Sequence, residues 1–79
     1  TDYISGGNGN NRLDGGNDND TLIGGVNNDT LIGGAGNDRL EGIAGVDNFS
    51  GGSGDDTLIA GDGGSTLDGG AGDDMYYIS

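Results

Sequence analysis

A single apolar residue recurs at every ninth position of this 79-residue chain. The series runs along the whole sequence without insertion or deletion, and its members are Ile4, Leu13, Leu22, Leu31, Leu40, Phe49, Leu58, Leu67 and Tyr76. A fixed short period of this kind is typical of a stacked repeat array. One nonapeptide unit is therefore copied along the chain, with one inward-facing residue in each copy.

Glycine marks the other regular positions of the unit. If the apolar residue is counted as place eight, all but one of the 21 glycines lie at places one, two or four, the exception being Gly64. Where place four is not glycine it is Asp18 or Asn27, the residue types that best tolerate a left-handed backbone. Places one to six therefore predict a turn. The last three places, as in residues 21–23, predict a short strand with its middle residue pointing inward.

The chain needs two such turns to return on itself, so we expect a coil of two repeats, or 18 residues. Coils stacked as parallel strands about 4.8 Å apart would make a rod about 21 Å long. The predicted fold is all-β, a right-handed parallel β-roll (a two-sheet β-solenoid) with 18 residues per coil and about four coils.

The predicted organisation is a single array over residues 1–79. It comprises a partial repeat at 1–5, full repeats at 6–14, 15–23, 24–32, 33–41, 42–50, 51–59, 60–68 and 69–77, and an exit strand at 78–79. Because the sequence starts inside a repeat, we expect the array to be a fragment of a larger protein.

The chain carries 14 acidic and two basic residues, which give it a net charge of −12. This composition on its own is typical of a disordered acidic tail, an interpretation that the regular period restricts to the metal-free state. A polyanion repels nucleic acid and anionic lipid, so neither is expected as a partner. The absence of cysteine excludes disulfides and thiolate metal sites. The apolar runs are too short to predict a membrane span.

Carboxylates occupy place six in most copies, and the period of 18 divides them between two edges of the roll. The aspartate edge carries Asp2, Asp20, Asp38, Asp56 and Asp74. The mixed edge carries Asn11, Asp29, Asp47 and Ser65. Stacked carboxylates repel one another, and a divalent cation between coils would turn the repulsion into attachment. Carboxylate and carbonyl oxygens without His or Cys favour Ca²⁺ over Zn²⁺, copper or octahedral Mg²⁺.

The clearest copies read GGAGNDRLE at 33–41 and GGSGDDTLI at 51–59. They are similar to the GGxGxDxUx nonapeptide of the repeats-in-toxin (RTX) family, and the resemblance covers residues 1–77. It implies a parallel β-roll with calcium ions held between the turns of neighbouring coils. It also implies an extracellular protein that a Gram-negative bacterium secretes through type I secretion machinery.

The resemblance also implies ligand positions. The expected side-chain ligands are Asp2, Asp20, Asp38, Asp56, Asp74, Asp29 and Asp47, with Asn11 as a weak ligand. The expected backbone carbonyl ligands are those of Gly15, Asn17, Gly33, Gly34, Ala35, Gly36, Gly51, Gly52, Ser53, Gly54, Gly70, Gly72, Gly24, Val26 and Gly45. We expect about five well-formed calcium sites, of which four lie on the aspartate edge and one at Asp29/Asp47, with one or two weak sites elsewhere on the mixed edge.

These features predict a non-enzymatic calcium-binding module that folds on binding calcium after secretion and stabilises or assists the export of a parent protein. The chain has no His, Cys or Lys to serve as nucleophile or base. The expected partners are calcium ions, the parent's catalytic or toxin domain and the secretion machinery. The sequence does not distinguish among a toxin, protease, lipase, epimerase or adhesin as the parent.

Acids outside place six are expected to face solvent, namely Asp14, Glu41, Asp55, Asp62, Asp68 and Asp73. Ile23, Ile59 and Tyr77 are expected on one outer face, either as ordinary exposed residues or as a docking face for the parent domain. Ordinary exposed residues and a docking face are thus both compatible with the sequence.

Two other function classes stay open. An adhesive or ice-binding solenoid would need an outward Thr ladder, which is interrupted here. A carbohydrate-binding module for alginate would need more basic surface than two Arg provide.

Overall fold

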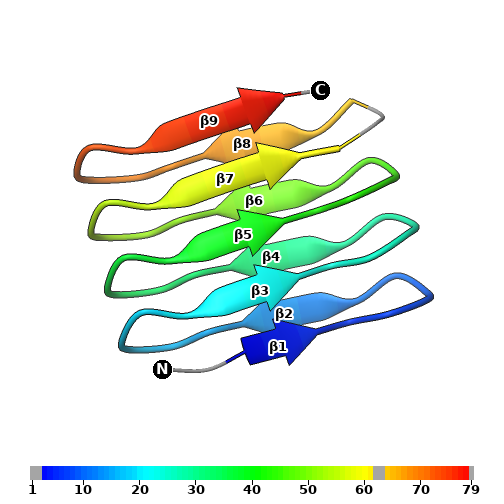
Figure 1. Cartoon of the computed structure of the whole chain (residues 1–79), viewed down its shortest axis with the longest axis horizontal. Helices are drawn as coiled ribbons and strands as arrows, with labels where there is room; N and C mark the ends of the chain where they lie inside the picture. Colours follow the sequence, from blue (N-terminus) through cyan, green and yellow to red (C-terminus); the bar gives the residue numbers. More distant parts are fainter. Residues whose placement is uncertain (1–2, 62–63, 79) are drawn as a thin grey trace.

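The computed structural model describes residues 3–61 and 64–78, which form nine short strands in two parallel sheets (Figure 1). Sheet A consists, in spatial order, of β1 (Tyr3–Ser5), β3 (Thr21–Ile23), β5 (Arg39–Glu41), β7 (Thr57–Ala60) and β9 (Met75–Ile78). Sheet B consists of β2 (Arg12–Asp14), β4 (Thr30–Ile32), β6 (Asn48–Ser50) and β8 (Thr66–Asp68). Successive strands alternate between the sheets, so the chain winds as a solenoid.

Each strand pairs with the strand 18 residues further along the chain. Leu22 lies opposite Leu40 in sheet A, and Leu31 lies opposite Phe49 in sheet B. The predicted all-β solenoid of about four coils with 18 residues per coil is therefore confirmed. The molecule measures 27 × 21 × 13 Å, with the coils stacked vertically in Figure 1. Among the described residues there is no helix that could cross a membrane.

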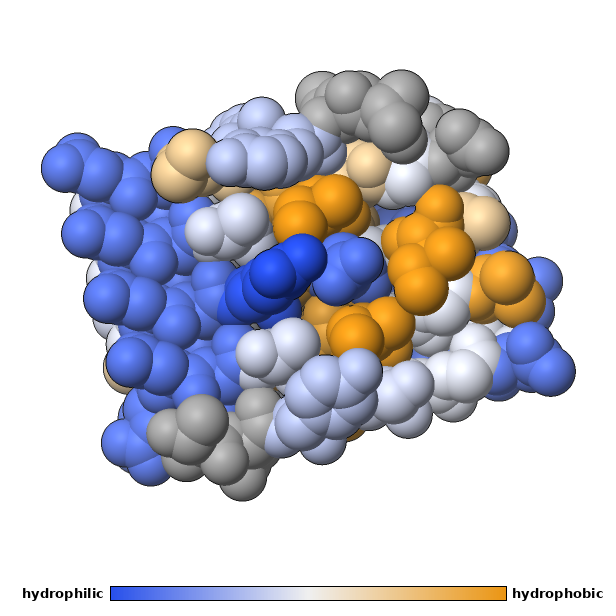
Figure 2. All heavy atoms as spheres, in the orientation of Figure 1, coloured by the Kyte–Doolittle hydropathy of each residue, from blue (hydrophilic) through white to orange (hydrophobic). Residues whose placement is uncertain are grey.

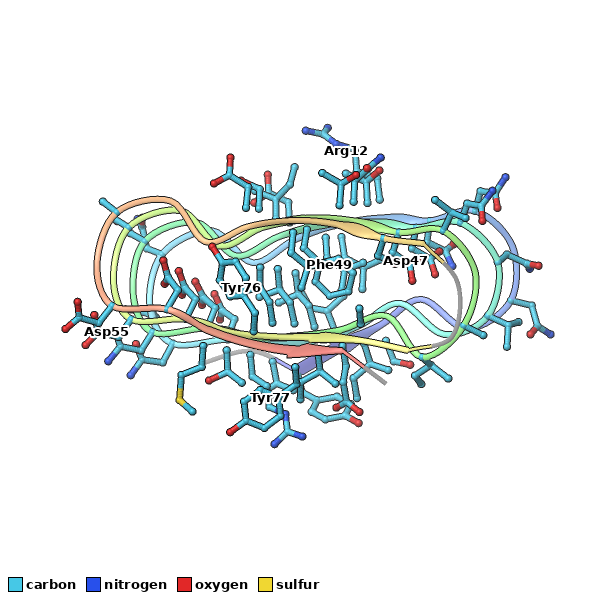
Figure 3. All side chains as sticks on the ribbon, turned by 90° about the horizontal axis from the view of Figure 1, so that it is seen from above. Arg12, Asp47, Phe49, Asp55, Tyr76 and Tyr77 are labelled. Atoms are coloured by element: carbon cyan, nitrogen blue, oxygen red, sulfur yellow. The ribbon has the colours of Figure 1, made fainter. Side chains whose placement is uncertain are left out.

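The core is one layer of inward side chains between the two sheets. Its buried members are Leu13, Leu22, Leu31, Leu40, Phe49 and Leu58. Phe49 lies between the sheets in the view down the solenoid (Figure 3). Each buried side chain of this size stabilises the fold by about 1.5–3 kcal/mol. Ile4 and Leu67 are only partly buried, because a coil at the end of the stack has a neighbour on one side only.

Places two and four of the turns hold the backbone in the left-handed region. Gly34 has a φ of 88° and Gly36 a φ of 102°. The replacements at place four, Asp18 and Asn27, have φ values of 78° and 76°, which confirms their predicted conformation. Ile43 occupies place two with a φ of 71°. That conformation costs about 1–2 kcal/mol for a residue with a Cβ.

Tyr76 replaces the inward aliphatic residue in β9, the last strand of sheet A. Its hydroxyl accepts a hydrogen bond of 2.7 Å from the N–H of Gly69, and its ring lies across the end of the solenoid (Figure 3). One coil earlier, the equivalent N–H of Gly51 donates to the carbonyl of Asp68 in the next coil. The tyrosine hydroxyl thus supplies the acceptor that a further coil would provide.

We expect Tyr76→Phe to lower the free energy of unfolding of the folded chain by about 1–3 kcal/mol, because the buried N–H of Gly69 loses its acceptor. Urea denaturation followed by circular dichroism measures this change. Tyr77→Phe is the matched control, since Tyr77 points outward from the same strand and is half exposed. Equal losses in the two variants would show that the hydroxyl of Tyr76 does not stabilise the last coil.

Candidate metal centres

Five aspartates at place six are buried inside the turns at the two edges. At most 3% of the surface of any of them is exposed, and they are Asp20, Asp29, Asp38, Asp47 and Asp56. Carboxylates are almost never buried to this degree unless they are paired, hydrogen-bonded or bound to a cation. Figure 3 shows Asp47 directed into the turn of the mixed edge. The turns therefore hold the candidate cation sites.

The structure keeps the predicted division of the place-six residues between two edges. Asp74 is half-buried in the last turn of the aspartate edge, and Asn11 and Ser65 are half-buried on the mixed edge. Asp2 and the predicted Asp2/Asp20 site lie outside the described residues.

One oxygen of each buried carboxylate binds the neighbouring coil. The N–H of Asp20 donates to Oδ1 of Asp38, and the N–H of Asp38 donates to Oδ1 of Asp56, both at 2.8 Å. On the mixed edge the N–H of Asp29 donates to Oδ1 of Asp47 at 2.7 Å. Each donor belongs to the coil before the carboxylate. The place-six side chains therefore tie each turn to the turn 18 residues earlier.

The second carboxylate oxygen is left without a hydrogen-bond partner at several of these residues. Within the described part of the chain, this holds for the buried Oδ2 atoms of Asp29, Asp38, Asp47 and Asp56. A buried charged oxygen that lacks a partner carries a large desolvation penalty. A cation at this position would remove the penalty, so the donor chemistry fits a metal.

The glycine at place one makes the space into which Oδ2 points. A Cβ built on Gly33 would lie 2.6 Å from Oδ2 of Asp38 and 2.8 Å from the carbonyl oxygen of Gly51. A Cβ on Gly51 would meet Asp56 and the carbonyl of Gly69 in the same way, at 2.5 and 2.8 Å. Because neither glycine has a positive φ, its requirement is steric. A cradle of one carboxylate oxygen and one carbonyl oxygen thus lies between adjacent coils.

Carbonyl oxygens at places two and four also point into the gap between coils. A Cβ built on Gly52 would meet the carbonyl oxygen of Gly34, and one built on Gly54 would meet that of Gly36. These oxygens face the following coil, whereas the place-one carbonyls of Gly33 and Gly51 face the preceding one. Oxygen ligands of the kind that Ca²⁺ prefers therefore converge on each turn from two coils.

Some of the predicted carbonyl ligands lie in the gap between adjacent coils. They are those of Gly24, Gly33, Gly34, Gly36, Gly51, Gly52 and Gly54. The other carbonyl ligands stay predictions, and they are those of Gly15, Asn17, Ala35, Ser53, Gly70, Gly72, Val26 and Gly45. Nowhere in residues 3–61 and 64–78 do three or more acidic side chains surround one point. A site here would combine at most two carboxylates with carbonyl oxygens.

The surroundings of Asp38, Asp47 and Asp56 favour the protonated form of their carboxyl groups by raising the pKa. Burial above all, together with the charges of Asp56 and Asp20, raises the pKa of Asp38 from its ordinary 3.8 to about 6, against the lowering effect of the hydrogen bond from the Asp20 N–H. Burial also raises the pKa of Asp47 and of Asp56, and the charges of Asp29 and Asp74, respectively, act in the same direction. A bound cation would offset both the burial and the repulsion.

The mixed edge departs from this arrangement at both of its ends. The side-chain amide of Asn11 donates to the carbonyls of Asn8 and Gly9 at 3.4 and 3.2 Å. Its nitrogen, and not its oxygen, faces the cradle at Gly6. The predicted weak site through the Asn11 oxygen therefore requires that this amide be reversed. At the other end, the Oγ of Ser65 accepts the N–H of Asp47 at 3.1 Å and supplies no charge.

A second ladder at place five was not predicted. The N–H of Asn37 donates to Oδ1 of Asn19 at 2.7 Å, and the N–H of Asp55 donates to Oδ1 of Asn37 at 2.8 Å. The side chain here binds the following coil, the reverse of place six. Asp55 is exposed, as predicted, and points outward in Figure 3, yet its Oδ1 accepts the N–H of Asp73 at 2.9 Å. Asn or Asp recurs at place five in the sequence, and this recurrence could have predicted the ladder.

Comparison with known proteins points to the same chemistry. The family described as RTX calcium-binding nonapeptide repeat (4 copies) matches residues 1–31, 23–58 and 50–77. No curated protein gives a significant match, and no solved structure does. The match covers nearly the whole chain, and the repeats that it describes are those whose turns hold the buried aspartates.

Proposed function

The chain belongs to the RTX calcium-binding nonapeptide repeat family, and on that premise we propose that it is a module in which calcium binding and folding are one equilibrium. The single observation that carries the proposal is the row of buried carboxylate oxygens without hydrogen-bond partners, of which those of Asp38 and Asp56 lie on the aspartate edge. Calcium bound between coils would supply their missing partner and link each coil to the next. The fold is a repeat module without a catalytic constellation in its described part.

The proposed ligands are the place-six side chains and the carbonyls that face the gap between coils. The side chains are Asp2, Asp20, Asp38, Asp56 and Asp74 on the aspartate edge, and Asp29 and Asp47 on the mixed edge. Each aspartate would contribute to the sites above and below it, so neighbouring sites share ligands and fill cooperatively. We propose about five well-formed sites, with weak ones at Asn11/Asp29 and Asp47/Ser65.

The proposed biological role is to delay folding until the parent protein has left the cell. Without calcium, a chain of net charge −12 with 21 glycines is an expanded polyanion. Outside, each site that is filled at about 100 times its dissociation constant stabilises the folded state by about 2.7 kcal/mol. Membership of a family typical of secreted Gram-negative proteins supports export through type I machinery, with the parent's catalytic or toxin domain as the attached partner.

Far-UV circular dichroism during a calcium titration, followed by removal of calcium with a chelator, tests the proposal. A steep, reversible transition from coil to β-structure is expected, because calcium relieves the buried carboxylates. A chain that is already β-rich without metal, or one that stays disordered at saturating calcium, would contradict calcium-coupled folding. Magnesium at equal concentration is the control and should be far less effective.

The two edges are expected to differ in the number of ions that one substitution removes. Asp38→Asn should abolish about two bound calcium ions, because Asp38 lies between two sites of the aspartate edge, and Asp47→Asn should abolish about one strong site. Asparagine keeps the Oδ1 that accepts the N–H from the preceding coil. Equilibrium dialysis counts the bound ions in each variant. A greater loss from Asp47→Asn would mean that the mixed edge carries the stronger row.

A further inference from the structure

The two outer faces of the solenoid differ in chemistry. The outward residues of sheet B are mostly Thr, Ser, Asn and Asp. Those of sheet A include Tyr3, Met75 and Tyr77, which are 71%, 53% and 50% exposed, together with Ile23 and Ile59. Figure 2 shows apolar side chains gathered over this face and its right-hand edge. Aromatic residues, Met and Arg are the types enriched in protein interfaces.

An ion pair lies at the centre of this face. Arg39 and Glu41 belong to β5, the middle strand of sheet A, and their side chains are 3.5 Å apart with exposed fractions of 56% and 30%. They flank the inward Leu40, at places seven and nine of one repeat. Arg39 is one of only two basic residues in the sequence. It lies between Thr21 and Thr57 of the neighbouring strands, whereas Glu41 lies between Ile23 and Ile59. A partner that packs on this face must therefore match one positive and one negative charge at its centre.

The two edges beside this face carry different charge. Asp18, Asp55 and Asp73 are exposed on the aspartate edge. The described turns of the mixed edge direct no charged side chain into solvent and instead expose Val26, Ile43 and Val46. A neighbour that lies across sheet A therefore meets an acidic border on one side and, along the described turns of the mixed edge, an apolar border on the other.

We propose that sheet A is a homodimer interface, on which a second copy of this chain packs face to face about a two-fold axis parallel to the stack of coils. This inference rests on the proposed function, because calcium must first fold the coils. Around this axis, each strand of sheet A lies over the same strand of the second copy, and the two strands run antiparallel. Place seven of one copy therefore faces place nine of the other. Arg39 then lies opposite Glu41 of the second copy, and Glu41 opposite its Arg39.

Charge decides between the possible two-fold axes. An axis parallel to the strands would set Arg39 against Arg39 and one aspartate edge beside the other, which like-charge repulsion disfavours. The axis along the stack sets the aspartate edge of each copy beside the mixed edge of the other, whose described turns expose Val26, Ile43 and Val46. It also brings Met75 against Tyr77 at the end of the stack. The face is thus complementary to itself in only one of these two arrangements.

The area of the face limits the surface that two copies can bury. The whole molecule measures 27 × 21 Å across this side, turns of both edges included, so each copy offers at most about 570 Å² and two copies would bury at most about 1,100 Å² in total. This lies at the lower end for specific complexes, where weak associations that exchange with monomer are found. Each Arg39 would exchange an exposed pair within its own chain for one that the second copy shields from water.

Sedimentation velocity of the calcium-loaded chain over a concentration series tests this interface, with circular dichroism on the same samples to report folding. The mass is expected to rise from monomer to dimer. Arg39→Glu should weaken the dimer by at least about tenfold, because two additional carboxylates enter the interface. The double exchange Arg39→Glu with Glu41→Arg should restore it, since each new arginine faces a new glutamate. Arg12→Glu, the same change at place seven of sheet B, is the matched control and should leave the dimer intact.

The outcomes separate this inference from the function on which it rests. A β-folded chain that remains monomeric at every concentration would overturn the dimer and leave calcium-coupled folding standing. A dimer that Arg39→Glu does not weaken, and that Ile43→Gly abolishes, would place the interface on the mixed edge and overturn the assignment to sheet A. A chain that does not fold with calcium would overturn the proposed function, and the dimer with it.

Discussion

Gly33→Ala is expected to raise the calcium concentration at which half of the chain is folded by at least about tenfold. The added Cβ would lie 2.6 Å from Oδ2 of Asp38 and 2.8 Å from the carbonyl oxygen of Gly51, two oxygens of the proposed cradle. Overpacking a buried site costs about 1–3 kcal/mol, and a displaced carboxylate would also weaken the two sites that it serves. The midpoint of a calcium titration followed by circular dichroism measures the effect.

Gly64→Ala is the matched control for this experiment. Among the described residues, a Cβ on Gly64 meets no atom within 4 Å beyond its chain neighbours, and Gly64 has no left-handed backbone. The substitution therefore makes the same chemical change without blocking a cradle, and its midpoint should stay near that of the unsubstituted chain. If the two variants shift the midpoint equally, the glycine at place one does not act by making room for the carboxylate.

Lowering the pH is expected to stabilise the calcium-free folded state, and so to have part of the effect of calcium. Burial raises the pKa of Asp38 to about 6 from an ordinary 3.8, so the folded state binds this proton more tightly than the unfolded state does. The contribution of protonated Asp38 to the stability of the folded state is therefore fully present below about pH 4 and is lost as the pH rises through 6. The difference for Asp38 corresponds to about 3 kcal/mol. The raised pKa values of Asp47 and Asp56 act in the same direction.

The calcium-free chain should thus gain β-structure as the pH is lowered from 7 toward 4, which circular dichroism and urea denaturation at each pH can follow. Asp38→Asn is the informative variant, because its amide is neutral at every pH and keeps the oxygen that accepts the Asp20 N–H. Its calcium-free form should be more stable at pH 7 and respond less to acid. Stability that falls on acidification without calcium would show that buried repulsion is not what opposes folding.

Most of the fold could be predicted from the nine-residue period. An apolar residue between two β-formers, as at Leu22, specifies a short strand and its buried face, because side chains alternate along a strand. Glycine at places two and four specifies turns with positive φ, and Asp18 shows that the interpretation extends to substitutes. With two turns per coil, the pairing of residues 18 apart follows, and the register of Leu22 with Leu40 confirms it.

The candidate site was predicted in outline from the same pattern. Aspartate at place six, in a chain without His or Cys, indicates oxygen-only chemistry, and the period assigns Asp38 and Asp47 to different edges. These inferences depend only on residue type and spacing. The burial of the two carboxylates follows from the turn geometry, and their raised pKa values follow from that burial.

The tertiary structure decided the contacts that run along the stack. Place six accepts from the preceding coil, as in the bond from Asp20 to Asp38, whereas place five accepts from the following one, as in the bond from Asn37 to Asn19. The glycine at place one, such as Gly33, is required by a carboxylate five residues later and by a carbonyl in the next coil. A period specifies which residues are stacked, but it carries no information on the direction in which a side chain leans along the stack. That direction is set by steric and hydrogen-bond complementarity between coils, which exists only once they are packed together.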